Sequence, residues 1–194
     1  MNIGIDIDGT LTQSLDIERL AKAYIKKNDL PYKLVNPKAS MVIDMFDWDS
    51  EICRQFYLAN CETLHVDVPA KEGASEIVSK LKQQGNKIYI ITARSVAWCR
   101  EPYKISEEWL KKYNIPFDEL LVEQFEKSDA CRQANIGCFI DDSVSVLKGL
   151  EPLSLPTILM ETKYNKEDTR YNGLRAKDWR ETEKLLNDLH VLEK

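Results

Sequence analysis

The chain is poor in glycine and proline, with 7 of each among 194 residues, so it lacks the composition of a disordered or fibrous protein. Basic residues are in the minority: 27 Lys and Arg stand against 32 Asp and Glu, a formal net charge of −5. A protein that binds polymeric nucleic acid usually carries a broad positive surface. We therefore expect no nucleic-acid partner, and any anionic ligand must be held by a few local charges.

Long apolar runs and a cysteine framework are also missing. No stretch approaches the roughly 20 apolar residues of a membrane span, and no basic segment followed by an apolar one opens the sequence. The 5 cysteines are odd in number and widely spaced, which fits neither a disulfide framework nor a Cys-x-x-Cys motif. These absences predict a cytoplasmic protein without membrane contact, whose thiols are buried or incidental.

What the chain does have is 43% hydrophobic residues, enough for one domain with a sizeable core. Short apolar runs, each followed by a polar turn and a helical pattern, are typical of buried parallel strands. The runs lie at 3–7, 87–91, 120–122, 138–140 and 157–160. They predict a doubly wound α/β domain with a parallel sheet of five strands, and the polar stretch 161–177 is expected to be a loop.

The segment between the first run and the helical pattern near residue 74 is much longer than a crossover needs. It contains two amphipathic patterns of its own, at 17–25 and 51–64. We expect a small helical cap at 13–68, inserted into a core made of 1–12 and 69–194. Such insertions lie beside the carboxyl ends of the strands, where ligands bind.

Acidic residues come at the ends of two predicted strands. Asp6 and Asp8 lie two positions apart, so their side chains leave the first strand on the same side. Asp141 and Asp142 end the fourth run, where adjacent acids are costly to bury without a cation. Hard oxygen ligands of this kind suit Mg²⁺. The alternative is a pair of ordinary turns with surface charges, but two such ends favour a metal site.

Polar residues that suit a phosphate come at the other strand ends. Thr92 offers a hydroxyl and a backbone N–H. Lys127, before a short helix, could neutralise carboxylates and a phosphoryl group, although a surface lysine is the commoner explanation. Thr10, Ala93 and Arg94 are candidate substrate contacts, and Arg94 either reaches an anionic substrate or simply sits in its turn.

In this order, Asp6-Ile7-Asp8-Gly9-Thr10, Thr92, Lys127 and Asp141-Asp142 resemble the four motifs of the haloacid dehalogenase (HAD) superfamily of phosphohydrolases. Segments 68–74, 88–94 and 127–143 look most like the 5′(3′)-deoxyribonucleotidase group and its bacterial relatives. The sequence departs from the animal enzymes in having Ala93-Arg94 where they have Ser-Pro after the threonine. The resemblance implies a HAD-like fold and hydrolysis of a small phosphorylated metabolite, with a nucleoside monophosphate as the leading substrate.

The resemblance also implies roles. Asp6 would attack phosphorus and form an aspartyl-phosphate. Asp8 would protonate the leaving oxygen and then take a proton from water. Thr92 and Lys127 would hold the phosphoryl oxygens. The Mg²⁺ ligands would be Asp6, the Asp8 backbone carbonyl, and the Asp141 and Asp142 pair, of which Asp142 looks like the direct ligand.

Several alternatives remain open. A sugar-phosphate phosphatase or phosphomutase would use the same motifs, and a phosphorylation-dependent signalling module also combines acids, Mg²⁺ and a lysine. The order of the acids and the cap argue against such a module. Whether the chain forms a homodimer is left open. His65 has no partner at metal-ligand or triad spacing and is expected to be solvated or structural. Four aromatic residues of the cap either stack on the substrate or form the cap's own core, which we favour: Phe46, Trp48, Phe56 and Tyr57.

Overall fold

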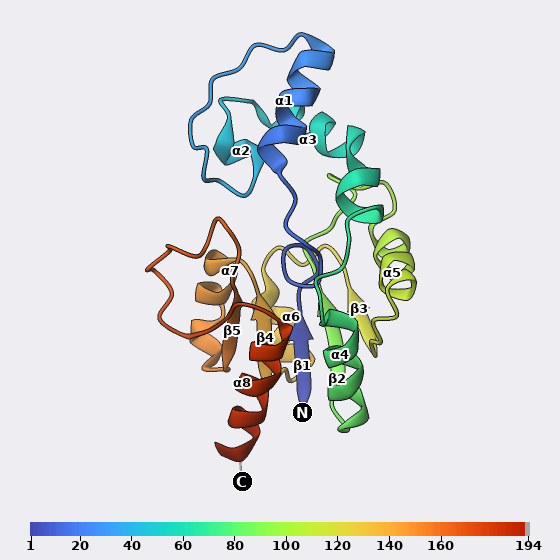
Figure 1. Ribbon diagram of the computed structural model, residues 1–194, viewed down its shortest axis with the longest axis vertical. Coiled ribbons are helices and arrows are strands. Elements are labelled where there is room, and N and C mark those ends of the chain that lie inside the picture. Colours follow the sequence, from blue (N-terminus) through green and yellow to red (C-terminus); the bar gives the residue numbers. More distant parts are fainter. Residues whose placement is uncertain (193–194) are drawn as a thin grey trace.

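A parallel sheet of six strands forms the centre of the computed structural model, which describes residues 1–192 (Figure 1). Its order is β3-β2-β1-β4-β5-β6, and every neighbouring pair is parallel. The strands are β1 (Asn2–Ile5), β2 (Lys87–Ile91), β3 (Glu119–Leu121), β4 (Cys138–Asp141), β5 (Thr157–Met160) and β6 (Leu174–Ala176). The expected α/β fold is confirmed.

The predicted count of five strands is corrected to six. The additional strand, β6, lies inside the stretch 161–177 that was expected to be a loop. It is three residues long and pairs only with β5, at the edge of the sheet. A short edge strand needs no continuous apolar run, so the sequence gives it no clear hydrophobic pattern.

Helices cover both faces of the sheet. One face packs against α4 (Ala74–Gln83), α5 (Pro102–Lys112) and α8 (Trp179–Leu192). The other packs against α6 (Lys127–Gln133) and α7 (Val144–Gly149), which is followed by the 3₁₀ helix η2 (Glu151–Leu153). Within residues 1–192, no helix is long and apolar enough to cross a bilayer.

Strand β1 lies between β2 and β4, so the chain runs outward from it in both directions. Ile3 and Ile5 are fully buried on one face. Gly4 faces the other way, where an added Cβ would lie 2.3 Å from a ring carbon of Phe139. Because the strand order reverses at β1, a crevice forms at the carboxyl ends of β1 and β4. Ligands of open α/β sheets bind in such a crevice.

Residues 13–68, called here the cap segment, lie beyond the carboxyl ends of the strands (Figure 1). They contain α1 (Ile17–Asn28), α2 (Val42–Met45), α3 (Ser50–Ala59) and the π-helix η1 (Glu62–Val66). Asp16 and Asp49 cap α1 and α3 by accepting from backbone N–H groups at 3.0 and 2.8 Å. The segment has a hydrophobic cluster of its own.

The aromatic residues of the cap segment belong to that cluster. Phe46, Trp48 and Phe56 are at most 6% exposed. The Phe46 and Trp48 rings stack with centroids 4.8 Å apart, and Trp48 contacts Phe56 at 5.9 Å. Tyr57 packs edge-on against both Phe56 and Trp98, which lies in the loop after β2. These side chains are packed against one another, which supports the interpretation that they form the cap's core.

Candidate active site

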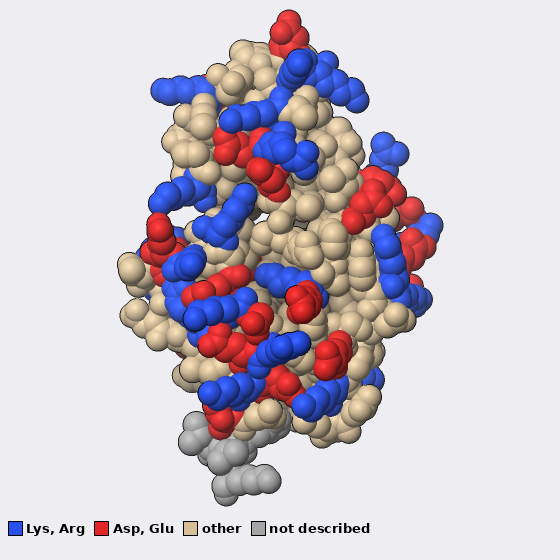
Figure 2. Space-filling view, in the orientation of Figure 1, with Lys and Arg blue, Asp and Glu red and all other residues tan. Residues whose placement is uncertain are grey.

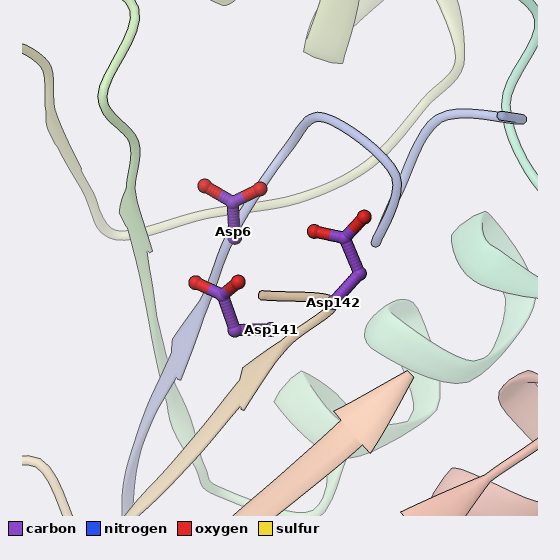
Figure 3. Close-up of side chains that lie close together, drawn as sticks. All are labelled: Asp6, Asp141 and Asp142. Carbon is purple, nitrogen blue, oxygen red and sulfur yellow. The ribbon is translucent and has the colours of Figure 1, made fainter. Parts of the chain in front are cut away.

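Three carboxylates converge at the carboxyl ends of β1 and β4. Asp6 follows β1, Asp141 ends β4 and Asp142 follows it, and each offers an oxygen atom within 4.8 Å of the others (Figure 3). All three residues are buried, with exposed fractions of 6%, 1% and 5%. The parallel register of β1 and β4 brings two acidic strand ends side by side, as the sequence predicted.

Lys127 neutralises part of this charge. Its ammonium donates to Asp6 Oδ1 at 2.6 Å and to Asp141 Oδ2 at 2.7 Å. Lys127 is 4% exposed, so the alternative of a surface lysine is wrong. Asp141 has a second donor, the backbone N–H of Ser143 at 2.7 Å. Burial lowers the pKa of Lys127. The negative charges of Asp141 and Asp6 raise this pKa by more than burial lowers it, so the side chain stays charged.

Asp142 is the acid without a donor. Its Oδ2 is buried and has no hydrogen-bond partner within residues 1–192. Burial, followed by repulsion from Asp141 and Asp6, raises its pKa well above the usual range. At Asp6, burial and the neighbouring carboxylates outweigh Lys127 and raise the pKa to about 7. A buried acceptor with surplus negative charge fits a divalent cation with hard oxygen ligands.

The turn after β1 requires glycine next to this cluster. Gly9 has a φ of +80°, and an added Cβ would lie 1.9 Å from Asp142 Oδ2. The Gly9 N–H donates to Thr12 Oγ1 at 2.9 Å, and its carbonyl accepts from the Lys71 ammonium. The turn therefore approaches Asp142 more closely than any side chain would allow, and Lys71 adds a second positive charge near the acids.

Asp8 is held by a buried arginine. Arg94 Nε donates to Asp8 Oδ2 at 2.8 Å and its Nη2 donates to Asp8 Oδ1 at 2.7 Å. The Arg94 side chain is 1% exposed, whereas that of Asp8 is 42% exposed. Burial raises the pKa of Asp8, but the charge and hydrogen bonds of Arg94, with a smaller contribution from His65, hold it well below its usual range.

His65 also lies beside Asp8, a contact that the sequence did not predict. It is 9% exposed and its Nδ1 lies 3.8 Å from Asp8 Oδ1. Neither ring nitrogen has a hydrogen-bond partner among the described residues. Of the two alternatives for His65, solvated or structural, its burial excludes the first. The position of His65 depends on where the chain comes back from the cap segment through η1. No local sequence pattern predicts that position.

Two further residues of the site come from the loops after β2 and β5. Thr92 is 1% exposed, and its hydroxyl accepts from the Arg94 N–H at 3.3 Å. Asn165 is also buried, and its Nδ2 donates to the carbonyls of Asp142 and Met160, both at 2.8 Å. Asn165 thus fixes the backbone beside the carboxylate cluster. It lies in the stretch 161–177 that was expected to be a loop.

The other two candidate substrate contacts, Thr10 and Ala93, have no side-chain hydrogen bond among the described residues. Ala93 is half-buried between Thr92 and Arg94. The Thr10 hydroxyl is buried and has no hydrogen-bond partner in the described part of the chain, while its carbonyl accepts from Trp179 Nε1 at 3.2 Å. Their contact with substrate stays a prediction.

A cleft of about 270 Å³ opens between the cap segment and the loop after β5. Its apolar lining includes Leu15, Ile17 and Met45. The Tyr164 hydroxyl, 2.8 Å from the position of an added Gly9 Cβ, connects the cleft with the carboxylate cluster. Lys and Arg side chains lie interspersed with Asp and Glu across the middle of this face of the molecule (Figure 2), and Glu18 and Glu167 also line the cleft. The lysines that line the cleft are Lys38, Lys163 and Lys166.

Comparisons with known proteins find relatives that are named as nucleotidases and phosphatases. A nucleotidase of Clostridium acetobutylicum is 25% identical over 194 residues, which cover 97% of this chain and 95% of its own. Among solved structures, a predicted phosphatase from Clostridium acetobutylicum superposes with a TM-score of 0.70 at 19% identity, over 96% of this chain and 98% of its own. A haloacid dehalogenase-like hydrolase from Streptococcus pneumoniae gives 0.67 at 14% identity, over 95% and 97%.

These neighbours confirm the HAD-like fold, and the sequence match goes further. A family model described as "5' nucleotidase, deoxy (Pyrimidine), cytosolic type C protein" matches residues 1–192. The matched range spans both acidic strand ends, Thr92 and Lys127. The resemblance that the four motifs indicated is therefore confirmed: the chain belongs to this family of nucleotidases, within the HAD-like phosphatases.

Proposed function

We propose that the protein is a Mg²⁺-dependent phosphomonoesterase that hydrolyses nucleoside monophosphates through an aspartyl-phosphate on Asp6. The observation that carries the proposal is the buried cluster of Asp6, Asp141 and Asp142 around Lys127, at the reversal of strand order. Buried acids with surplus negative charge are costly unless they hold a cation.

The proposed metal ligands are Asp6, Asp142 and the Asp8 carbonyl, with Asp141 assisting from beside them. The unpartnered Oδ2 of Asp142 supports this assignment, because hard carboxylate oxygen is the preferred Mg²⁺ ligand. When bound, Mg²⁺ supplies positive charge that stabilises the phosphoryl oxygens as charge develops on them.

In the first half of the reaction, an Asp6 carboxylate oxygen attacks phosphorus. The bond to the leaving oxygen breaks, and Asp8 supplies the proton that this oxygen needs. Lys127, which donates to the nucleophile, and the Thr92 hydroxyl, which comes at the carboxyl end of the neighbouring strand β2, would hold phosphoryl oxygens. The product of this step is an alcohol and the aspartyl-phosphate.

In the second half, water attacks the aspartyl-phosphate. Asp8 takes a proton from that water, the bond between phosphorus and the Asp6 oxygen breaks, and orthophosphate leaves. The pairing with Arg94 supports this role by geometry, because it orients the Asp8 carboxylate and leaves one side of each oxygen free to accept a proton.

The substrate's leaving group is assigned to the cleft between the cap segment and the loop after β5. Its volume of about 270 Å³ and its apolar residues suit a sugar and base. In this proposal, 13–68 acts as a cap over a core made of 1–12 and 69–194. The cap aromatics pack the cap itself, so we assign substrate selection to residues that line the cleft, Met45 and Tyr164 among them.

The test is phosphate release from a panel of nucleoside monophosphates, sugar phosphates and an aryl phosphate, with Mg²⁺ or with EDTA. Asp6→Asn, which keeps the shape of the side chain, is measured beside the wild type. We expect release that needs Mg²⁺, favours a nucleoside monophosphate and is lost in the variant. Preference for a sugar phosphate, or its isomerisation without phosphate release, would replace the proposed substrate class. Release that persists in Asp6→Asn would remove the nucleophile from the proposal.

A further inference from the structure

Arg94 makes more contacts than a residue that only closes a turn would need. Its guanidinium donates to both oxygens of Asp8, at 2.8 and 2.7 Å. The remaining nitrogen, Nη1, lies 3.3 Å from Ser106 Oγ and 3.5 Å from the His65 carbonyl. One buried group therefore joins the turn after β1, helix α5 and the π-helix η1.

This arrangement fixes the orientation of a carboxylate that little else restrains. The Asp8 side chain is 42% exposed. Besides Arg94, the Asp8 carboxylate has His65 nearby, whose Nδ1 lies 3.8 Å from Asp8 Oδ1. The planar fork of an arginine sets the plane of the carboxylate that it binds, which a lysine cannot do. Both oxygens keep a free side that Arg94 does not occupy, because each accepts one of its N–H groups.

We propose that Arg94 is a positioning residue for the second half of the reaction: its fork holds Asp8 where the carboxylate can take the proton of the attacking water. The inference rests on the proposed function, since it needs the aspartyl-phosphate on Asp6. It replaces direct substrate binding as the main role of Arg94.

The step that depends on Arg94 is the attack of water on the aspartyl-phosphate. The oxygen of water forms a bond to phosphorus, and one proton of that water moves to a free side of the Asp8 carboxylate. The bond between phosphorus and the Asp6 oxygen breaks, and its electrons restore the Asp6 carboxylate. Arg94 keeps its protons throughout, so it acts on the rate only through the place and charge of Asp8.

The contact with the His65 carbonyl gives this positioning a link to the cap segment. His65 lies in η1, where the chain returns from the cap segment toward the sheet. Ser106 anchors the opposite side of the guanidinium from a fully buried position on α5. A shift of η1 would therefore reach Asp8 through a single side chain.

The test uses Arg94→Lys, which keeps the positive charge and removes the fork. The substrate is an aryl phosphate, whose leaving group departs without a proton donor, so only water attack depends on Asp8. We expect a rapid burst of the phenol, stoichiometric with enzyme, followed by steady-state turnover about 100-fold slower than in the wild type. Because kcat/KM reports the first step alone, it should change far less than kcat.

Arg54→Lys is a matched control. Arg54 binds Glu51 with the same fork geometry, at 2.8 and 2.7 Å, but on an exposed helix of the cap segment. It should behave as the wild type. The double variant Asp8→Asn with Arg94→Lys should turn over no more slowly than Asp8→Asn alone, because a residue that acts only through Asp8 has no effect once Asp8 is changed.

The outcomes separate the inference from the proposed function. If the wild type releases no phosphate from any substrate, the proposed function fails. If the wild type is active and Arg94→Lys lowers kcat and kcat/KM equally, or lowers the rate further in the Asp8→Asn background, Arg94 acts on substrate or on the fold and the inference is wrong. Where Arg94→Lys does not fold, Ser106→Ala, which removes one anchor of the guanidinium, should show the same burst with a smaller loss of kcat.

Discussion

The close approach of Gly9 to Asp142 leads to a prediction with an internal control. Gly9 and Gly85 have nearly equal positive φ angles, +80° and +86°. An added Cβ at Gly9 would lie 1.9 Å from Asp142 Oδ2 and 2.6 Å from its Cγ, whereas at Gly85 nothing lies within 4 Å. Alanine at the two positions therefore meets similar backbone strain but very different surroundings.

The expected magnitudes follow from these two terms. A left-handed conformation costs an L-residue roughly 1–2 kcal/mol, so Gly85→Ala should lower the free energy of unfolding by about that amount. Gly9→Ala carries the same cost, and forcing Asp142 aside adds about 1–3 kcal/mol. Because Asp142 is a proposed metal ligand, we also expect Gly9→Ala to lose most of the stabilisation that Mg²⁺ gives the wild type.

The assay is urea unfolding followed by circular dichroism, in EDTA and in excess Mg²⁺, for the wild type and both variants. Gly85→Ala should show the same gain on adding Mg²⁺ as the wild type, and Gly9→Ala a smaller one. Equal destabilisation by the two substitutions, together with equal gains from Mg²⁺, would refute the argument that the Gly9 turn and Asp142 form one site.

Three further predictions concern the carboxylates and the cap core. In EDTA at pH 8, Asp142→Asn should be more stable than the wild type, on the order of 1 kcal/mol, because it removes a charge whose pKa burial and its neighbours raise; in Mg²⁺ the order should reverse. With a pKa of about 7, Asp6 binds a proton more readily in the folded than in the unfolded metal-free chain. Its contribution should therefore fade as pH rises through about 7, and urea midpoints in EDTA at pH 5.5 and 8 should differ less in Asp6→Asn than in the wild type. Phe56→Ala should lower the free energy of unfolding by about 3–5 kcal/mol, since this ring is fully buried; unchanged stability would show that it does not form the cap's core.

Local sequence pattern was sufficient for the elements that carry the chemistry. Apolar runs of strand length ended in Asp6 and Asp141, and parallel strands bring their carboxyl ends to one edge. The position of the acids in the chain therefore already implied that they meet. The length of the segment after the first strand likewise indicated an inserted helical unit, because a crossover needs far fewer residues.

Contacts between distant segments were decided only by the tertiary structure. Arg94 and Asp8 are 86 residues apart, and Asn165 and Asp142 are 23 apart. No periodicity links such pairs, since their meeting depends on how loops from different strands pack above the sheet. His65 comes to Asp8 only because η1 returns along this edge.

Sequence and structure thus determined different parts of the site. The sequence by itself determined the α/β class and the order of the acidic, threonine and lysine motifs, because strand periodicity and strand ends are local properties of the chain. Only the tertiary structure decided that Lys127 is buried between Asp6 and Asp141, that Asp142 Oδ2 has no donor among residues 1–192, and that Arg94 holds Asp8. The reason is physical: burial and pairing of charge depend on every segment that packs around them, and no single segment encodes them.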